Sequence, residues 1–125
     1  METMEQRVEV FDVGRALNSV GDDREFLSEF VGIIQAAWPT LLADIRRGLG
    51  EMDLHAVRTT ARLATAAAQY LSAKRTYEAA RQVETIAGNE DWKGAREAVA
   101  NLEREVETLQ IFLASLDDLG QPSGG

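Results

Sequence analysis

The sequence predicts an all-α protein, an antiparallel up-down four-helix bundle with a short N-terminal lead-in helix. Apolar residues recur at spacings of three and four along most of the chain, and no segment alternates apolar and polar residues as a half-buried strand would. Four substantial helical patterns are joined by short connections, which is the usual arrangement of such a bundle. We expect an N-terminal arm over residues 1–10, one bundle domain over 11–117 and a disordered tail over 118–125.

The lead-in helix is expected over residues 12–19, because apolar residues there have helical spacing and Gly21 then supplies a stop. Asp22 or Asp23 offers an N-cap for the first long helix. Pro39 should kink or restart that helix, because proline lacks a backbone donor. The apolar stripe before the proline is predicted to form one core-facing band: Phe26, Leu27, Phe30, Ile33, Ile34, Ala37 and Trp38.

The second long helix is expected over residues 54–71, with Asp53 as its N-cap. Its small core-facing residues suit a central helix, because they let neighbouring helices approach closely. A third helix should stop near Gly88-Asn89, and Asp91 can cap a long last helix. The expected core residues of these three helices are Leu54, Val57, Ala61, Ala64, Ala68, Leu71, Tyr77, Ala80, Val83, Ile86, Ala87, Ala95, Val99, Leu102, Val106, Leu109, Phe112 and Leu113.

Composition excludes several classes of function. The chain has a net charge of −8, which argues against nucleic-acid binding, since that requires clustered Lys and Arg. It contains no cysteine and a single histidine, so we expect no metal site, no cofactor and no ordinary enzyme activity. The absence of cysteine suits a cytoplasmic protein, and we identify neither a signal peptide nor a stretch long and apolar enough to span a membrane.

Several short segments follow one another in a characteristic order over roughly residues 11 to 113. They are Phe11-Asp12 with Ala16-Leu17, Gly21-Asp22 with Glu25-Phe26-Leu27 and Phe30, Pro39-Thr40-Leu41-Leu42 with Ile45, and Gly50-Glu51-Met52-Asp53. In this order and at these separations they resemble the histidine phosphotransfer (HPt) domains of bacterial phosphorelays. The resemblance implies a helical bundle whose partners are response-regulator receiver domains or hybrid sensor kinases.

The sequence departs from the HPt pattern at the positions that carry the chemistry. The family has Ala-His-x-Leu-Lys-Gly-x-Ala-x-x-Leu-Gly-Ala, whereas this chain has a run over residues 61–73 in which Ala61, Ala68, Leu71 and Ala73 match. Arg62 replaces the histidine, Thr65 the lysine and Ala66 the glycine, while Val83-Glu84 stands where the family often has Leu-Glu. A guanidinium stays protonated, so it cannot accept a phosphoryl group, but it can still pair with an acidic pocket.

Helical geometry predicts a solvent-facing strip on the second long helix. At about 100° per residue, residues spaced by seven align on one side, opposite the alanine-rich core face. The strip consists of His55, Arg58, Thr59, Arg62, Thr65, Ala66 and Gln69. We interpret it as a surface that docks receiver domains, with an ordinary polar helix face as the alternative.

Two other functions remain open at this stage. A seven-residue slip keeps the same helix face and would make His55 an active phosphoacceptor. Alternatively, the bundle is a scaffold for oligomerisation or for an unrelated protein partner. Trp38 could belong to a docking surface, but its place on an apolar stripe favours the core, and Tyr70 and Trp92 are likewise assigned to packing. The sequence leaves the oligomeric state undefined.

Overall fold

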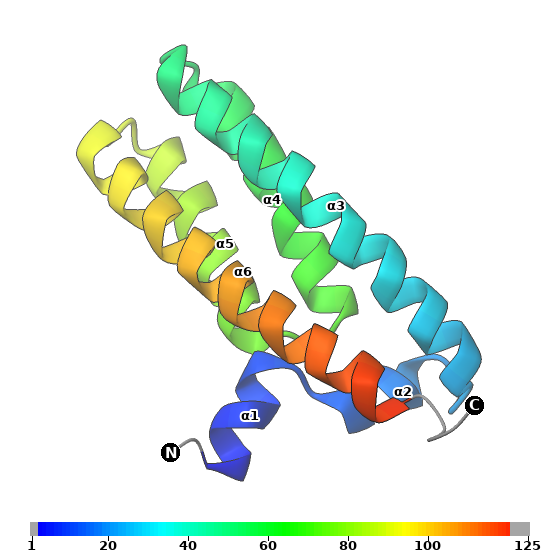
Figure 1. Ribbon diagram of the computed structural model, residues 1–125. Coiled ribbons are helices and arrows are strands. Elements are labelled where there is room, and N and C mark those ends of the chain that lie inside the picture. The colour runs from blue at the N-terminus through cyan, green and yellow to red at the C-terminus, as the bar shows by residue number, and fades with distance from the viewer. Residues whose placement is uncertain (1–2, 121–125) are drawn as a thin grey trace.

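The computed structural model describes residues 3–120, and this part of the chain forms six α-helices and no strand. The all-α prediction is therefore confirmed. The helices are α1 (Met4–Val10), α2 (Val13–Ser19), α3 (Arg24–Gly50), α4 (Leu54–Tyr70), α5 (Lys74–Gly88) and α6 (Trp92–Gly120) (Figure 1).

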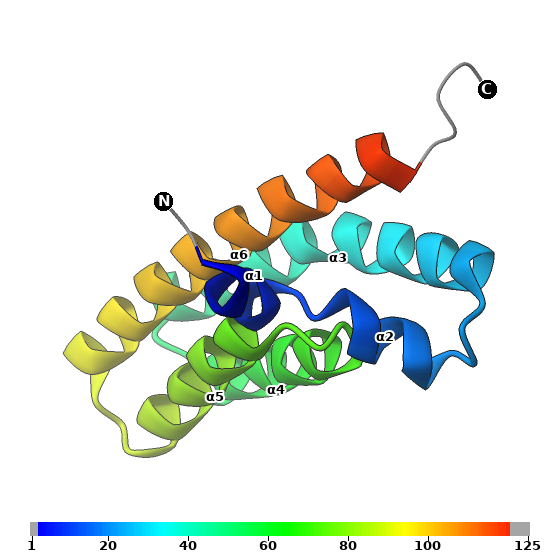
Figure 2. The ribbon, with the colours of Figure 1, turned by 90° about the horizontal axis from the view of Figure 1, so that it is seen from below.

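The four long helices lie side by side, and the two short ones close one end (Figure 2). Helices α3 and α5 each contact both α4 and α6, while α1 contacts α5 and α6, and α2 contacts α3. One continuous core runs between them, and its large fully buried side chains include Trp38, Ile45, Leu71, Leu102, Leu109 and Leu113. The core assignment of Trp38 is thus confirmed, and this side chain is unavailable to a docking partner.

Aspartate side chains cap the start of four of the helices, and three of these caps, all but Asp12, are at positions that the sequence predicts. The carboxylates of Asp12, Asp23 and Asp53 each accept a hydrogen bond of 3.0 Å from the backbone N–H three residues later. Asp91 accepts one of 2.9 Å from the Gly94 N–H in the first turn of α6. Each bond satisfies a backbone donor that the helix leaves without an intrahelical partner, which fixes where these helices start.

Helix α1 lies within the predicted N-terminal arm, where the sequence analysis identifies no helix. Its start is a capping box: the Thr3 side chain accepts from the Gln6 N–H, and the Gln6 side chain accepts from the Thr3 N–H. At the other end, α6 continues to Gly120, so residues 118–120 of the predicted disordered tail are helical. Residues 121–125 of that tail lie outside the described residues.

Pro39 does not restart α3, which continues unbroken from Arg24 to Gly50, so this part of the prediction is wrong. Proline removes the N–H that would bond to the carbonyl oxygen of Gln35, four residues earlier. That oxygen instead accepts a hydrogen bond of 3.0 Å from Nε2 of Gln110 on α6. A side chain from the last helix therefore completes the backbone hydrogen bonding of α3.

We expect Gln110→Met to lower the free energy of unfolding by about 1–2 kcal/mol, because it leaves the Gln35 carbonyl oxygen without its donor. In a Pro39→Ala background the restored backbone N–H supplies that bond, so the same change should cost less. Urea unfolding of the two single variants and the double variant measures this coupling. Strictly additive changes in the free energy of unfolding would contradict the view that Gln110 replaces the backbone donor missing at Pro39.

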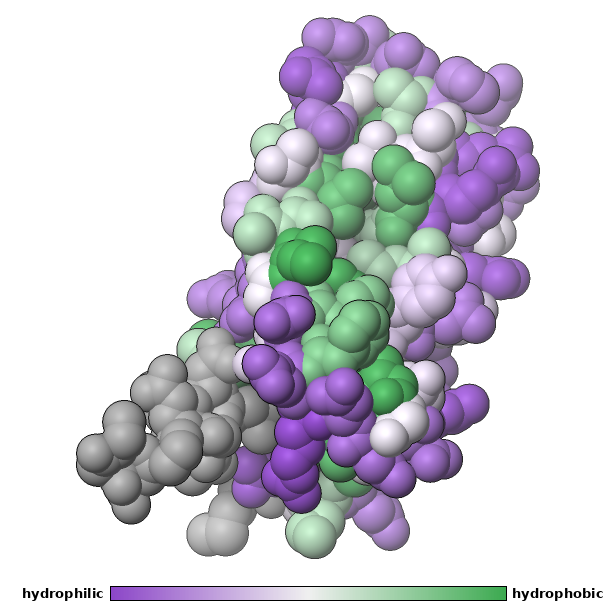
Figure 3. All heavy atoms as spheres, turned by 90° about the vertical axis from the view of Figure 1, so that its right-hand side faces the viewer, coloured by the Kyte–Doolittle hydropathy of each residue, from purple (hydrophilic) through white to green (hydrophobic). Residues whose placement is uncertain are grey.

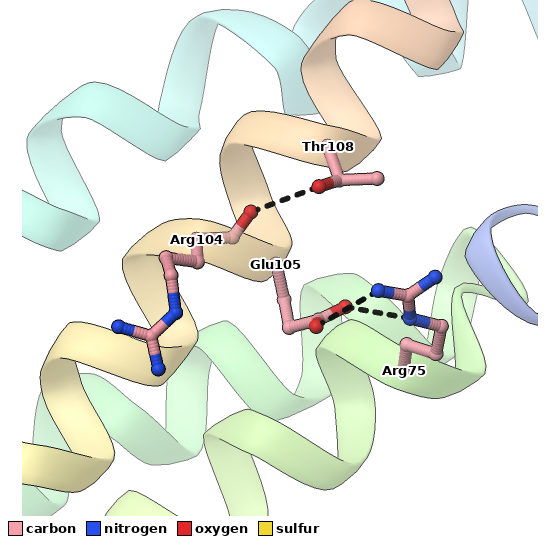
Figure 4. A network of polar contacts seen from close by, with 4 residues as sticks. All are labelled: Arg75, Arg104, Glu105 and Thr108. Carbon is pink, nitrogen blue, oxygen red and sulfur yellow. Dashed lines mark hydrogen bonds and ion pairs between the residues drawn. The ribbon is translucent and has the colours of Figure 1, made fainter.

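Two ion pairs connect α6 to its neighbours. Arg46 on α3 donates two hydrogen bonds to the Glu103 carboxylate, one of them from Nε at 2.9 Å. Arg75 on α5 binds Glu105 through Nε at 2.8 Å and Nη2 at 3.0 Å (Figure 4). Paired donors fix orientation as well as charge, so each of these two clamps adds a directional contact between α6 and a neighbouring helix.

The Arg46 clamp predicts a pH dependence of stability. Hydrogen bonds from Arg46 lower the pKa of Glu103 below its ordinary value. A lowered folded-state pKa stabilises the protein above the ordinary pKa of glutamate, and this contribution is lost as the pH falls through the lowered value. We expect Glu103→Gln to cost less than about 1 kcal/mol at pH 7, because the pair is partly exposed. The difference from wild type should disappear in acid; urea unfolding at pH 7 and below pH 4 tests this.

Among the described helices, α3 alone is long and apolar enough to cross a membrane by length and composition, which the sequence analysis did not anticipate. A core helix can meet the same criterion. Leu27, Ile34 and Ile45 of α3 are buried in the core, but much of the helix surface is exposed.

Candidate docking surface

Helix α4 lies between α3 and α5 and carries the predicted site. Most residues of α4 that face the core are small: Val57, Ala61, Ala64 and Ala68 are fully buried, and the larger Leu54 packs against the core at the start of the helix. Gly48 of α3 lies against Val57: a Cβ atom on this glycine would be 2.9 Å from Val57 Cγ2. The close approach of α3 and α4 therefore depends on residues with little or no side chain.

Six of the seven predicted strip residues are exposed on α4: His55, Arg58, Thr59, Arg62, Ala66 and Gln69. Thr65 is not, because only 8% of its surface is accessible, and its Oγ1 donates a hydrogen bond of 2.9 Å to the Ala61 carbonyl. Its predicted exposure is wrong. Thr65 follows Ala61 by four residues, so it lies on the same buried side of α4 as Ala61. The hydrogen bond to the Ala61 carbonyl satisfies the Thr65 hydroxyl at this buried position.

Arg62 lies near the middle of the exposed strip and forms an ion pair with α5. Its Nε donates to Oε1 of Glu84 at 3.2 Å, and the Glu84 carboxylate is the more buried partner. The resemblance places Val83-Glu84 on this helix, but the sequence alone does not predict which α4 residue meets Glu84. The ion pair holds the Nε edge of the guanidinium toward α5. The rest of the Arg62 side chain is largely exposed to solvent.

Arg58 lies one turn before Arg62 and adjoins Gly88 of α5. Its guanidinium atoms are 3.7–3.9 Å from the position that a Cβ atom on Gly88 would take. These are ordinary van der Waals distances, so the arginine side chain lies against α5 and an alanine at position 88 would also fit. No ion pair links Arg58 to another described residue, so this strip presents a positive charge on an acidic protein.

His55 is exposed in the first turn of α4, two residues after the capping Asp53. Arg62 is two turns further along the same helix. The two side chains therefore lie on the same face of α4 but at different points along it. No described residue forms a hydrogen bond with the His55 imidazole, so nothing in this part of the chain fixes its orientation.

An apolar seam borders the strip where α3 meets α4, and the sequence analysis missed it. Phe26 stacks on Phe30 with ring centroids 6.3 Å apart, and Phe30 contacts the edge of Tyr70 at 6.1 Å. Apolar side chains gather along this side of the molecule (Figure 3). The seam consists of Phe26, Phe30, Ile33, Leu63 and Tyr70, and all but the half-buried Phe30 are more than half exposed.

The seam corrects the predicted core. Phe26 and Ile33 were expected to be buried, and Tyr70 was expected to serve packing, yet all three are exposed. The stripe on α3 contains adjacent apolar pairs such as 26–27 and 33–34, whose members point about 100° apart. Such a stripe is wider than one helix face, and this was the signal that part of it lies outside the core.

Within the described residues, no group of three or more His, Asp or Glu side chains is placed to hold a metal ion. The surface has the character of a protein interface instead, because it combines exposed aromatic residues with arginine.

Comparison with solved structures identifies the fold. The HPt domain of a sensor hybrid histidine kinase from Shewanella superposes with a TM-score of 0.76, at 13% sequence identity, over 87% of this chain and 94% of that domain. No family model and no curated protein matches the sequence. The resemblance to HPt domains is thus confirmed at the level of the fold.

Proposed function

We propose that this chain is an HPt-like four-helix bundle in the cytoplasm that docks receiver domains, either of response regulators or of hybrid sensor kinases, without accepting a phosphoryl group. The observation that carries the proposal is the environment of Arg62, which is exposed on α4. Arg58 lies one turn before it on the same helix, and the apolar seam runs beside the strip that contains both arginines.

The chemistry of the strip supports binding without transfer. Phosphoryl acceptance needs a nucleophile with a free lone pair, and a protonated guanidinium offers none. A receiver domain presents carboxylates around its phosphorylation site, and Arg58 and Arg62 can form charge-assisted hydrogen bonds with such groups. The seam supplies apolar area beside these charges, as an interface of useful affinity requires.

Incubation with a panel of receiver domains from the source organism tests the proposal. Each receiver is phosphorylated with a small-molecule phosphodonor, and both complex formation and acid-labile label on this chain are measured. We expect a complex without label, weakened about tenfold or more by Arg62→Ala and unaffected by the same change at the exposed Arg96 of α6.

Two results would overturn the proposal. Label that disappears with His55→Ala would identify an active phosphotransfer protein with a displaced histidine. Failure to bind any receiver would instead favour a scaffold for oligomerisation or for an unrelated partner.

A further inference from the structure

A groove lies between α1 and the end of α4 with the turn that leads to α5. Its volume is about 750 Å³, and it also borders α2. The apolar part of its lining comes from Met4 and Val8 on α1, Ala68 on α4, Ala73 at the turn and Tyr77 on α5. Of the docking strip, only Gln69 reaches this groove.

Specific contacts hold the α1 wall in place. The Arg7 guanidinium lies 5.3 Å from the centre of the Phe112 ring, and Phe11 meets the same ring edge-on at 6.3 Å. The Asp12 N–H donates a hydrogen bond of 3.1 Å to the Ser72 carbonyl. Val10 and Phe11 are buried, so α1 is anchored at its C-terminal end while Met4 and Val8 stay exposed. The groove is thus built into the fold.

The charged residues that line the groove are mostly acidic. Glu5, Glu9, Asp12 and Glu78 are opposed by Arg15 and Lys74. Glu5 and Glu9 are one turn apart on α1, an arrangement in which like charges destabilise a helix. None of these four carboxylates forms an ion pair with another described residue. A cation bound here would relieve that repulsion.

We propose that this groove binds a basic amphipathic helix of a partner protein. Apolar side chains at helical spacing would enter between α1 and Tyr77, and Lys or Arg side chains beside them would face Glu5, Glu9 and Glu78. The open wall favours a protein segment over a small molecule, because Met4 is 81% exposed whereas small-molecule sites enclose most of their ligand. The inference concerns a second surface and does not depend on receiver binding.

Titration of the isotopically labelled full chain with a helical Leu/Lys peptide of roughly 15 residues tests this proposal by NMR. A Leu/Glu peptide of the same pattern is the control ligand. We expect the basic peptide to shift amide resonances of α1, the α4–α5 turn and the start of α5, and the acidic peptide to shift none.

Charge variants separate the groove from general attraction to an acidic protein. The double change Glu5→Lys and Glu9→Lys should weaken binding at least about tenfold. The matched double change Glu97→Lys and Glu107→Lys, at exposed positions of α6, alters the net charge equally and should weaken it less than about twofold. Val8→Asp should also abolish the shifts, with circular dichroism confirming an intact fold. Equal weakening by both double variants, or shifts scattered over other faces, would overturn the proposal.

Discussion

Replacing Ile33 with glutamate is expected to weaken receiver binding at least about thirtyfold, which corresponds to about 2 kcal/mol. Ile33 is 69% exposed in the centre of the apolar seam, so the change removes apolar contact and places a carboxylate where the partner should be apolar. Because the side chain does not contribute to the core, stability should change by less than about 0.5 kcal/mol. Titration calorimetry with the receiver identified by the panel measures the effect.

Ile111 provides the matched control. It is 66% exposed on α6, outside the seam, so Ile111→Glu makes the same chemical change at the same exposure on another helix. We expect this variant to bind as wild type does. Equal loss in both variants would indicate a nonspecific charge effect, and unchanged binding of the Ile33 variant would remove the seam from the interface.

Gly48→Ala should lower the free energy of unfolding by about 2 kcal/mol. The added Cβ atom would lie 2.9 Å from Val57 Cγ2 and 3.2 Å from the Val57 backbone nitrogen, so α3 and α4 must move apart. Alanine's better helix propensity offsets only part of this cost. Chemical denaturation monitored by circular dichroism gives the value.

Gly32→Ala on the same helix is the control, because nothing lies within 4 Å of its added Cβ atom. It should stabilise the protein by about 0.5–1 kcal/mol, since alanine restricts the unfolded chain more than glycine does. A Gly48→Ala variant as stable as the Gly32→Ala variant would show that the α3–α4 contact tolerates more separation than the structure implies.

The sequence predicts helix boundaries well because they depend on local chemistry. Asp23, Asp53 and Asp91 act within one turn of their own position, and apolar spacing identifies the buried faces of α4 and α6 correctly. Helix α1 was missed although its capping box of Thr3 and Gln6 is a local signal, and the contact of Arg7 with Phe112 that holds the helix against α6 is not visible in the local pattern.

The candidate surface was predicted only in part, because its limits depend on neighbouring helices. The periodicity of α4 predicts that Thr65 faces solvent. It does not show that the residue lies on the same buried side of the helix as Ala61. Similarly, spacing alone does not separate the core residues of α3 from Phe26 and Ile33. The pairing of Arg62 with Glu84 joins residues 22 positions apart, and single-helix patterns carry no information about it.

Four connections share a less common backbone conformation in a residue other than glycine: Asp22, Met52, Ser72 and Glu90 have φ values of 61°, 56°, 57° and 58°. Glycine usually occupies such positions, since a side chain costs about 1 kcal/mol there. These residues therefore carry backbone strain that the packed core must offset. Replacing each of them with glycine would release that strain.

The hydrogen bond between Gln35 and Gln110 has a consequence for biosynthesis. The two residues are 75 positions apart, so α3 emerges from the ribosome well before its missing donor is translated. Until then the carbonyl opposite Pro39 must bond to water, and the middle of α3 is open to bending. We therefore expect the middle of α3 to reach its final shape only when α6 docks against it and Gln110 supplies the missing hydrogen bond.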